Sequence, residues 1–333
     1  FLSPERPLLV DEYLGNAIEL DVDAVCDGDE VLIGAIMEHL EEAGIHSGDS
    51  TCFIPPQNIS KRILAEVEDW TRRIGIELGV KGCYNIQFAI RGETLYVLEV
   101  NPRGSRTFPF VAKATGVPLA RIAARLALGE KLCDLSVPKP QTEAVCVKAP
   151  VFPFIKLRGL DPAPGPEMKS TGEVMGSHVR AAAAYLKARL ATELPVPTEG
   201  GVYITVKNAD KYDVIPLAQE LEEMGFTIYA TRGTSHVLRD SGGVDVQTCY
   251  RITEGLTPDA LDLMRQGKIH LIINTPRNTG GAVLDGNMMR RLAVELNIPF
   301  VTTMAGARME VRAIDEAMQG MPEPRLLKIS TLG

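Results

Sequence analysis

The sequence predicts an α/β protein whose two halves follow different plans. In the first half, residues 84–103 form two alternating apolar strands around a turn at Gly92, which is typical of a β-hairpin. In the second half, short apolar strands alternate with helical stretches from residue 201 onward. Such a run of βα units predicts a five-stranded parallel sheet covered by helices on both faces. We place the domain boundary at the proline- and glycine-rich run 195–201.

The first half contains further strands and helices besides the hairpin. The predicted strands span 8–14, 17–26 and 30–37, and the predicted helices span 60–79, 118–128 and 181–191. Ser60 is the expected N-cap of the first helix. Residues 136–166 read as a proline-rich connector that contains a strand within 145–154.

The strand predicted at 17–26 carries a regular series of acids. Glu19, Asp21 and Asp23 alternate with apolar residues, so all three carboxylates share one face of the strand. This alternation predicts a half-buried sheet with an acidic outer face.

The second half is a regular series of alternating elements. The predicted strands span 201–206, 226–231, 244–249, 269–275 and 298–303, and the predicted helices span 211–224, 234–241, 258–267, 285–296 and 305–318. Hydroxyl, amide and basic residues stand at the carboxyl ends of the strands, at 205–207, 231–234, 274–277 and 302–303. Ligands of parallel sheets bind at those ends, and helix N-termini favour phosphate, so an anion pocket is expected there. The alternative is that these residues are ordinary helix caps.

Length and composition exclude several classes of protein. The chain has 333 residues, enough for two domains with their own cores, and its net charge of −8 argues against nonspecific nucleic-acid binding. No apolar run approaches a membrane span, and we expect no signal peptide. The six cysteines include no Cys-x-x-Cys pair, so neither a zinc site nor a disulfide framework is indicated, and a reducing cytoplasm fits. The chain begins Phe1-Leu2-Ser3 without Met, and we expect a fragment of a longer protein.

One face of the hairpin is polar. Glu99 and Asn101 point the same way along their strand, and Gln87 is expected opposite them. Mg²⁺ takes such oxygen ligands together with phosphate and water, and Arg103 follows directly as a cation beside the proposed metal. The alternative is a solvated outer face. The other face is expected to supply core residues, namely Ile86, Phe88, Ile90 and Val97.

Several longer runs carry a resemblance to a known family. AIELDVDAVCDG (17–28), IMEHLEEAGIHSGDS (36–50), NIQFAI (85–90), LEVNPRGSRTFPFVAKATGVPLA (98–120) and GPEMKSTGEVMG (165–176) resemble the second ATP-grasp half of carbamoyl phosphate synthetase large subunits. ATRGTS (230–235), INTP (273–276) and FVTTMAGA (300–307) resemble the methylglyoxal-synthase-like domain that closes the same subunit. The resemblance implies the carboxyl-terminal subdomain of an ATP-grasp domain at 1–135, a connector completing that half at 136–198, and a Rossmann-like allosteric domain at 199–333.

The resemblance also implies roles for residues of the first half. It implies ATP with Mg²⁺ or Mn²⁺, and it implies the metal ligands Gln87, Glu99 and Asn101, of which the first two also lie near the phosphates. It further implies that Glu12 and Leu14 contact adenine, that Glu19 binds the ribose, and that Arg103 lies near the reacting phosphate. A loop that lines the nucleotide is implied at Gly44, Ile45, His46 and Ser47. On its own, His46 would be read as a surface or capped histidine. Arg106 is left open between a second anion contact and a salt-bridge donor.

The implied activity is phosphorylation of carbamate by ATP to form carbamoyl phosphate, a step in pyrimidine and arginine biosynthesis. The implied partners are the amino-terminal part of the large subunit and a glutaminase small subunit. The amino-terminal ATP-grasp subdomain, its phosphate-covering lysine and the Gly-rich lid are missing from this sequence, so the chain alone is expected to bind ATP weakly and to catalyse little.

The resemblance further implies a regulatory nucleotide, UMP or IMP. Its phosphate pocket maps to Thr205, Lys211, Thr231, Thr234, Arg251 and Asn274. Arg251 stands where a lysine is usual, and Pro276 where some members have a hydroxyl residue. Ala149 stands where some members have a glutamate that helps to bind ornithine, so we expect a weak response or none to ornithine.

Three other readings of the sequence remain. A stand-alone methylglyoxal synthase would carry a histidine and a catalytic aspartate where this chain has Arg232-Gly233-Thr234 and a loop at 274–276 without an acid. A different ATP-grasp ligase, such as a biotin carboxylase-like enzyme, would explain residues 8–130 but not a regulatory domain. A nucleotide-sensing module without chemistry is compatible with the second half.

Overall fold

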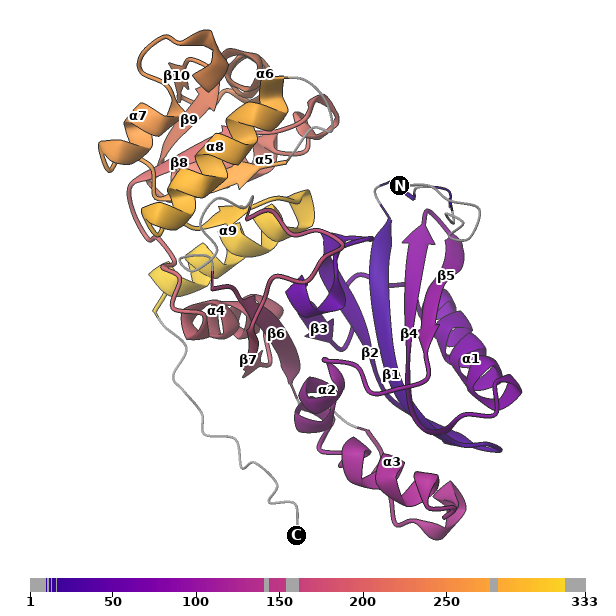
Figure 1. The fold of residues 1–333 in the computed structure, drawn as a ribbon. Helices are drawn as coiled ribbons and strands as arrows, with labels where there is room; N and C mark the ends of the chain where they lie inside the picture. The colour runs from indigo at the N-terminus through magenta and orange to yellow at the C-terminus, as the bar shows by residue number, and fades with distance from the viewer. Residues whose placement is uncertain are drawn as a thin grey trace.

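The computed structural model describes residues 17–140, 144–153, 162–275 and 281–320, together with Val10, Glu12, Leu14 and Gly15. Two sheets organise these residues (Figure 1). The first sheet contains β1 (Ile18–Asp27), β2 (Val31–Glu42), β3 (Cys52–Ile54), β4 (Lys81–Arg91), β5 (Thr94–Asn101), β6 (Val145–Val151) and β7 (Gly172–His178). Its order is β5-β4-β1-β2-β3-β6-β7, and all neighbours are antiparallel.

The predicted strands of the first half are confirmed in part. The strand at 17–26 is β1, and the strand at 30–37 is β2, which runs on to Glu42. The strand predicted at 8–14 falls mostly outside the described residues, and Val10, Glu12 and Leu14 are not in a strand. The short β3 and the edge strand β7 were not predicted.

The acidic outer face predicted for β1 is wrong. Glu19, Asp21 and Asp23 are 1%, 0% and 0% exposed. β1 lies inside the sheet between β2 and β4. Its apolar face, which carries Leu20 and Val22, packs into the core with α1 (Lys61–Glu77). The acidic face is covered too, because Asp23 contacts polar residues that precede α2 (Phe108–Thr115).

The hairpin forms as predicted, with one exception. Gln87 pairs with Glu99, and after a register shift Phe88 pairs with Val97, which leaves Leu98 as the extra residue of a bulge. Ile86, Phe88 and Ile90 are buried as expected. Val97 is 39% exposed, so its predicted core position is wrong, because β5 is an edge strand and its bulge disturbs the alternation.

Helices cover the first sheet on both sides. In α1, the Ser60 hydroxyl accepts from the backbone N–H of Ile63 at 3.4 Å, which confirms the predicted cap. The other predicted helices are α3 (Leu119–Ala127) and α4 (Ala181–Ala191), whereas α2 was not predicted. Short 3₁₀ turns are η1 (Ser47–Asp49), η2 (Leu132–Asp134), η4 (Asn208–Asp210) and η5 (Ile252–Glu254).

The second sheet confirms the predicted parallel plan. It contains β8 (Gly201–Thr205), β9 (Thr227–Thr231), β10 (Val246–Cys249), β11 (Leu271–Asn274) and β12 (Phe300–Val301), in the order β10-β9-β8-β11-β12. Its helices are α5 (Ile215–Glu223), α6 (Arg232–Gly242), α7 (Ala260–Arg265), α8 (Gly281–Glu295) and α9 (Met304–Met318). Residues of α5, α6 and α9 form the core on one face, and residues of α7 and α8 form the core on the other.

The two halves meet where α4 packs against α9 (Figure 1). Alanines of α4 and Met309 and Ala313 of α9 share one apolar cluster. In the described part of the chain, no helix combines the length and the apolar character needed to span a bilayer.

Candidate functional site

A cleft of about 450 Å³ lies at the polar end of the hairpin. Its lining brings together nine of the residues expected in the first half, namely Glu19, Gly44, Ile45, His46, Ser47, Gln87, Glu99, Asn101 and Arg103. Glu12 and Leu14 are not among the lining residues, and Glu12 instead forms an exposed ion pair with Arg91 at 3.2 Å. The lining residues that sequence reasoning did not assign are Asn85, Leu98, Ser105, Pro166 and Met168.

The strand register concentrates oxygen donors at one end of the cleft. Gln87 lies opposite Glu99, and Asn85 lies opposite Asn101. The Asn101 amide donates to Glu99 at 2.6 Å, and its oxygen accepts from Arg103 at 3.2 Å. One carboxylate and two amides form a donor set that suits a hard cation, which would take its remaining oxygens from phosphate and water. Two of these three ligands are amides, and within the described ranges no group of three or more His, Cys, Asp and Glu side chains could hold a metal ion.

The loop at 44–47 also lines the cleft. A Glu19 carboxylate oxygen accepts from the Gly44 N–H at 3.0 Å, which ties the loop to β1. His46 Nδ1 accepts from the Gly48 N–H at 3.0 Å, so His46 caps η1 while it lines the cleft. Below the loop, the buried Lys148 donates to the Ser47 carbonyl at 2.7 Å. The loop is therefore fixed by hydrogen bonds to residues of the sheet, Glu19 and Lys148.

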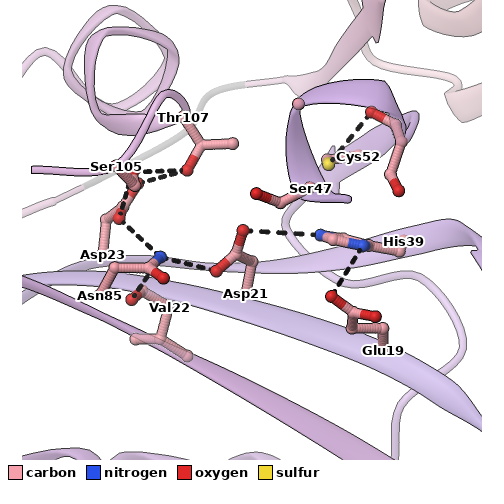
Figure 2. Close-up of polar contacts among 12 residues, drawn as sticks. Glu19, Asp21, Val22, Asp23, His39, Ser47, Cys52, Asn85, Ser105 and Thr107 are labelled. Carbon is pink, nitrogen blue, oxygen red and sulfur yellow. Dashed lines mark hydrogen bonds and ion pairs between the residues drawn. The ribbon is translucent and has the colours of Figure 1, made fainter. Parts of the chain in front are cut away.

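A row of buried polar side chains runs beneath the cleft (Figure 2). His39 lies between Glu19 and Asp21, at 3.6 and 3.8 Å. The Asn85 amide donates to Asp21 at 2.6 Å and to Asp23 at 2.9 Å, so one NH₂ group bridges two carboxylates. Asp23 in turn accepts from the side-chain hydroxyls of Ser105 and Thr107, each at 2.7 Å.

Burial changes the proton affinity of this row. Burial and the Asp21 charge raise the pKa of Asp23 to about 7, although hydrogen bonds from Ser105, Thr107 and Asn85 oppose the shift. Burial likewise raises the pKa of Glu19, against the effect of His39. Burial alone would lower the pKa of His39, but Cys52, Asp21 and Glu19 outweigh it and hold that pKa well above its ordinary value. A charged imidazolium therefore separates two buried acids.

Arg103 and Arg106 stand at the rim of the cleft. Both are exposed and line it. Arg103 donates to the Asn101 side chain and to the Gly104 carbonyl, both at 3.2 Å. For Arg106, the described parts of the chain offer no hydrogen-bond or ion-pair partner, so its side chain is available to an anion in the cleft.

A second pocket, of about 70 Å³, lies at the carboxyl ends of β8, β9 and β11. All six residues expected to hold the effector phosphate line it: Thr205, Lys211, Thr231, Thr234, Arg251 and Asn274. Asn274 is oriented by Arg290, which donates to its side-chain oxygen at 2.8 Å. Asp285 and Met289 line the same pocket and were not predicted, and Pro276 lies outside the described residues.

Ala149 lies in a third cavity, of about 500 Å³, where the two halves meet. Glu41 and Asp49 are in its wall, but backbone N–H groups already engage both carboxylates, at Thr51 and at Lys169 and Ser170. The Ala149 methyl adds no further charge to this cavity. The expected weakness toward ornithine stays a prediction.

Comparison with known proteins covers both halves. Residues 3–135 match the family described as carbamoyl-phosphate synthase L chain, ATP binding domain, and residues 213–302 match the MGS-like domain. The carbamoyl phosphate synthase large chain of Methanothermobacter thermautotrophicus is 49% identical over 96% of this chain. The large chain, C-terminal section, of Methanocaldococcus jannaschii is 47% identical, also over 96% of this chain.

The chain is therefore similar, along almost its whole length, to carbamoyl phosphate synthase large chains. It spans 30% of the Methanothermobacter protein and 53% of the Methanocaldococcus section. A biotin carboxylase domain of a thermophilic 2-oxoglutarate carboxylase shares 16% identity, with a TM-score of 0.44 over 55% of this chain and 47% of that one, which is too distant a likeness to support an argument.

These matches decide between two of the alternative interpretations of the sequence. A biotin carboxylase-like ligase or a stand-alone methylglyoxal synthase would account for only one half of the chain, whereas large chains match both halves in one alignment.

Proposed function

We propose that the first half of this chain contributes to a site that phosphorylates carbamate with MgATP, as part of a longer large chain. The observation that carries the proposal is the hairpin register, because it gathers Gln87, Glu99, Asn101 and Arg103 at one end of the cleft. The 44–47 loop and Glu19 line the same cleft, and a nucleoside would be held against them. Phosphoryl transfer depends chiefly on such positioning and on charge neutralisation.

Each side chain has a defined task in this proposal. Glu99, Asn101 and Gln87 hold Mg²⁺ or Mn²⁺, which when bound neutralises charge on the nucleotide phosphates. Arg103 offsets negative charge on the transferring group, and Glu19 accepts from the ribose hydroxyls. Asn101 donates to Glu99 and accepts from Arg103, so the acid, the amide and the guanidinium are pre-aligned.

The test uses the full-length large chain with ATP, bicarbonate and ammonia. Glu99→Gln or Asn101→Asp should lower carbamoyl phosphate formation on the order of 100-fold or more, because each disturbs a ligand of the metal that neutralises the phosphates. Glu93→Gln is the matched control, since Glu93 is an exposed acid in the turn of the same hairpin, and it should leave turnover unchanged. Wild-type turnover in both site variants at saturating Mg²⁺ would contradict the proposal.

We further propose that the second half binds a mononucleotide effector, UMP or IMP. The pocket at the strand ends combines two cations, Lys211 and Arg251, with hydroxyls of Thr231 and Thr234. Thr234 lies in the first turn of α6, where backbone N–H groups and the helix dipole favour a phosphate. Asp285, which also lines the pocket and accepts from Thr253, is a candidate acceptor for the sugar or base.

Calorimetry on the 333-residue chain tests the effector assignment. UMP or IMP should release heat on binding, and Thr234→Ala combined with Arg251→Ala should weaken binding on the order of 100-fold, because both remove charge-assisted or helix-end contacts. Thr227→Ala combined with Arg265→Ala changes the same residue types outside the pocket and should bind as wild type. No heat from either nucleotide at millimolar concentration would leave only the helix-capping explanation.

A further inference from the structure

Two acids of the buried row are not used by the proposed chemistry. Glu19 lines the cleft, but Asp21 and Asp23 lie beneath it and have no exposed surface. Of the two, Asp23 contacts a segment far along the chain rather than the nucleotide loop. Burying a carboxylate is unfavourable unless it is hydrogen-bonded, so the hydrogen-bond partners of Asp23 indicate its role.

Asp23 holds the chain between β5 and α2. One of its oxygens accepts from Ser105 and the other from Thr107, and the two hydroxyls are themselves 2.8 Å apart (Figure 2). Thr107 stands at the N-cap of α2, yet its hydroxyl makes no cap hydrogen bond. A threonine at this position would ordinarily cap its own helix. Here the hydroxyl donates to Asp23 of β1 instead.

The segment tied down in this way carries the arginines of the cleft. Residues 102–106 form no regular secondary structure, and Pro102, Arg103, Gly104 and Arg106 are exposed. Arg103 and Arg106 line the cleft on either side of Ser105. A loop of this kind would move freely without an anchor. The anchor is fixed in turn, because Asn85 bridges Asp23 to Asp21 and itself lines the cleft.

We propose that Asp23 is a positioning residue, which through Ser105 and Thr107 fixes the segment 102–106 and so aims Arg103 and Arg106 at the reacting phosphate. The inference rests on the proposed carbamate-phosphorylating function. It assigns Asp23 no contact with substrate. Its effect falls on the transition state, because a guanidinium displaced by about 1 Å loses much of its value there.

The enzymatic test uses the full-length large chain in the reverse direction. The phosphoryl group of carbamoyl phosphate passes to the β-phosphate of ADP, so the P–O bond to carbamate breaks, a P–O bond to ADP forms, and carbamate leaves. Thr107→Val keeps the shape of the side chain and removes the hydroxyl, whereas Thr107→Ser keeps the hydroxyl. We expect Thr107→Val and Asp23→Asn to lower kcat about 10- to 100-fold with the KM for MgADP within about twofold. Thr107→Ser should restore kcat to within about twofold of wild type.

Thr115 supplies the matched control. It is a buried threonine at the other end of α2 whose hydroxyl donates to Val111 O at 2.8 Å and accepts from the Val117 N–H at 3.4 Å, so both of its partners are local. Thr115→Val should leave kcat unchanged. If Thr107→Val behaves like Thr115→Val, or if Thr107→Ser is as slow as Thr107→Val, the positioning role is overturned.

Hydrogen exchange on the 333-residue chain tests the anchor without relying on activity. Thr107→Val should speed exchange of the backbone amides at 103–107, and Thr107→Ser should not. Unchanged exchange in Thr107→Val would overturn the inference even if the variant folds and binds normally. A wild-type large chain that forms no ATP from carbamoyl phosphate and MgADP would instead refute the proposed function, while the exchange result would still decide the anchor.

Discussion

Asp23 lies in surroundings that disfavour its charge, and this has a consequence for stability. It has no exposed surface, and the charges nearest to it in the row are Asp21 and, beyond Asp21, His39. The folded chain keeps a proton on Asp23 up to about pH 7, whereas an unfolded aspartate loses it near pH 4 (about 3.9). Between these values the folded state binds more protons than the unfolded state, so this contribution to the free energy of unfolding falls as pH rises.

The stability of Asp23→Asn relative to wild type should therefore increase as pH rises. The amide cannot ionise, so the difference in free energy of unfolding between variant and wild type should move in favour of the variant from about pH 4 to about pH 7. Urea unfolding of both proteins at several pH values measures this difference. Asp69→Asn, at an exposed acid on α1, should show no such trend. A difference for Asp23→Asn that is constant with pH would show that Asp23 is ionised throughout.

At the scale of elements, β7 and α4 show how closely backbones approach in this fold. A Cβ at Gly176 of β7 would lie 2.2 Å from Ala184 O and 2.5 Å from Ala188 N. Both alanines are fully buried, so the strand lies directly on the helix backbone. Such an approach requires glycine on the strand and small residues on the helix.

Gly176→Ala should separate these two elements. Because the new methyl meets backbone atoms that cannot rotate away, we expect a loss of about 1–3 kcal/mol in the free energy of unfolding. Gly172→Ala changes the same strand where the nearest atom to a new Cβ is Val151 Cβ at 3.9 Å, and it should cost less than about 0.5 kcal/mol. Chemical denaturation compares the two. Equal stabilities would mean that β7 can shift away from α4.

The same elements show how far sequence patterns reach. Alternation correctly predicted β1, the hairpin and the parallel order of the second half, because it reports which side chains share a face. It could not predict what covers a face, and the hydroxyl partners of Asp23 lie 82 and 84 residues further along the chain. Val97 was misplaced because a one-residue bulge at Leu98 leaves no trace in composition. The first-half site residues matched to the family came together in the cleft, apart from Glu12 and Leu14, and the effector residues came together in the second pocket.

At the scale of the whole molecule, a buried ion pair links the two halves. Glu310 of α9 is completely buried, accepts from the Tyr185 hydroxyl at 2.7 Å and pairs with Arg189 of α4 at 3.2 Å. Apolar residues of both helices surround this contact. The halves also touch at β2, where the Thr303 hydroxyl donates to the Leu40 carbonyl at 3.2 Å and Lys207 pairs with Glu42 at 3.5 Å. An effect of a nucleotide in the second half on the cleft in the first half can therefore pass through the α4–α9 junction or through β2.

Breaking the buried pair should cost far more than breaking a more exposed pair at the same junction. Glu310→Ala leaves the Arg189 side chain, which is only 11% exposed, without its acid, so we expect a loss of about 3–5 kcal/mol in the free energy of unfolding. Arg180 and Glu316 form the matched pair, at 2.6 Å with the Arg180 side chain 62% exposed, and Glu316→Ala should cost no more than about 1 kcal/mol. Replacing both partners, as Glu310→Leu with Arg189→Met, should recover much of the stability, because no buried charge then lacks a partner. Urea unfolding of the 333-residue chain measures all three variants. If the double variant is stable but UMP or IMP no longer affects carbamoyl phosphate formation in the full-length large chain, the ion pair transmits the effector signal. If the effector response survives, the pair only holds the halves together.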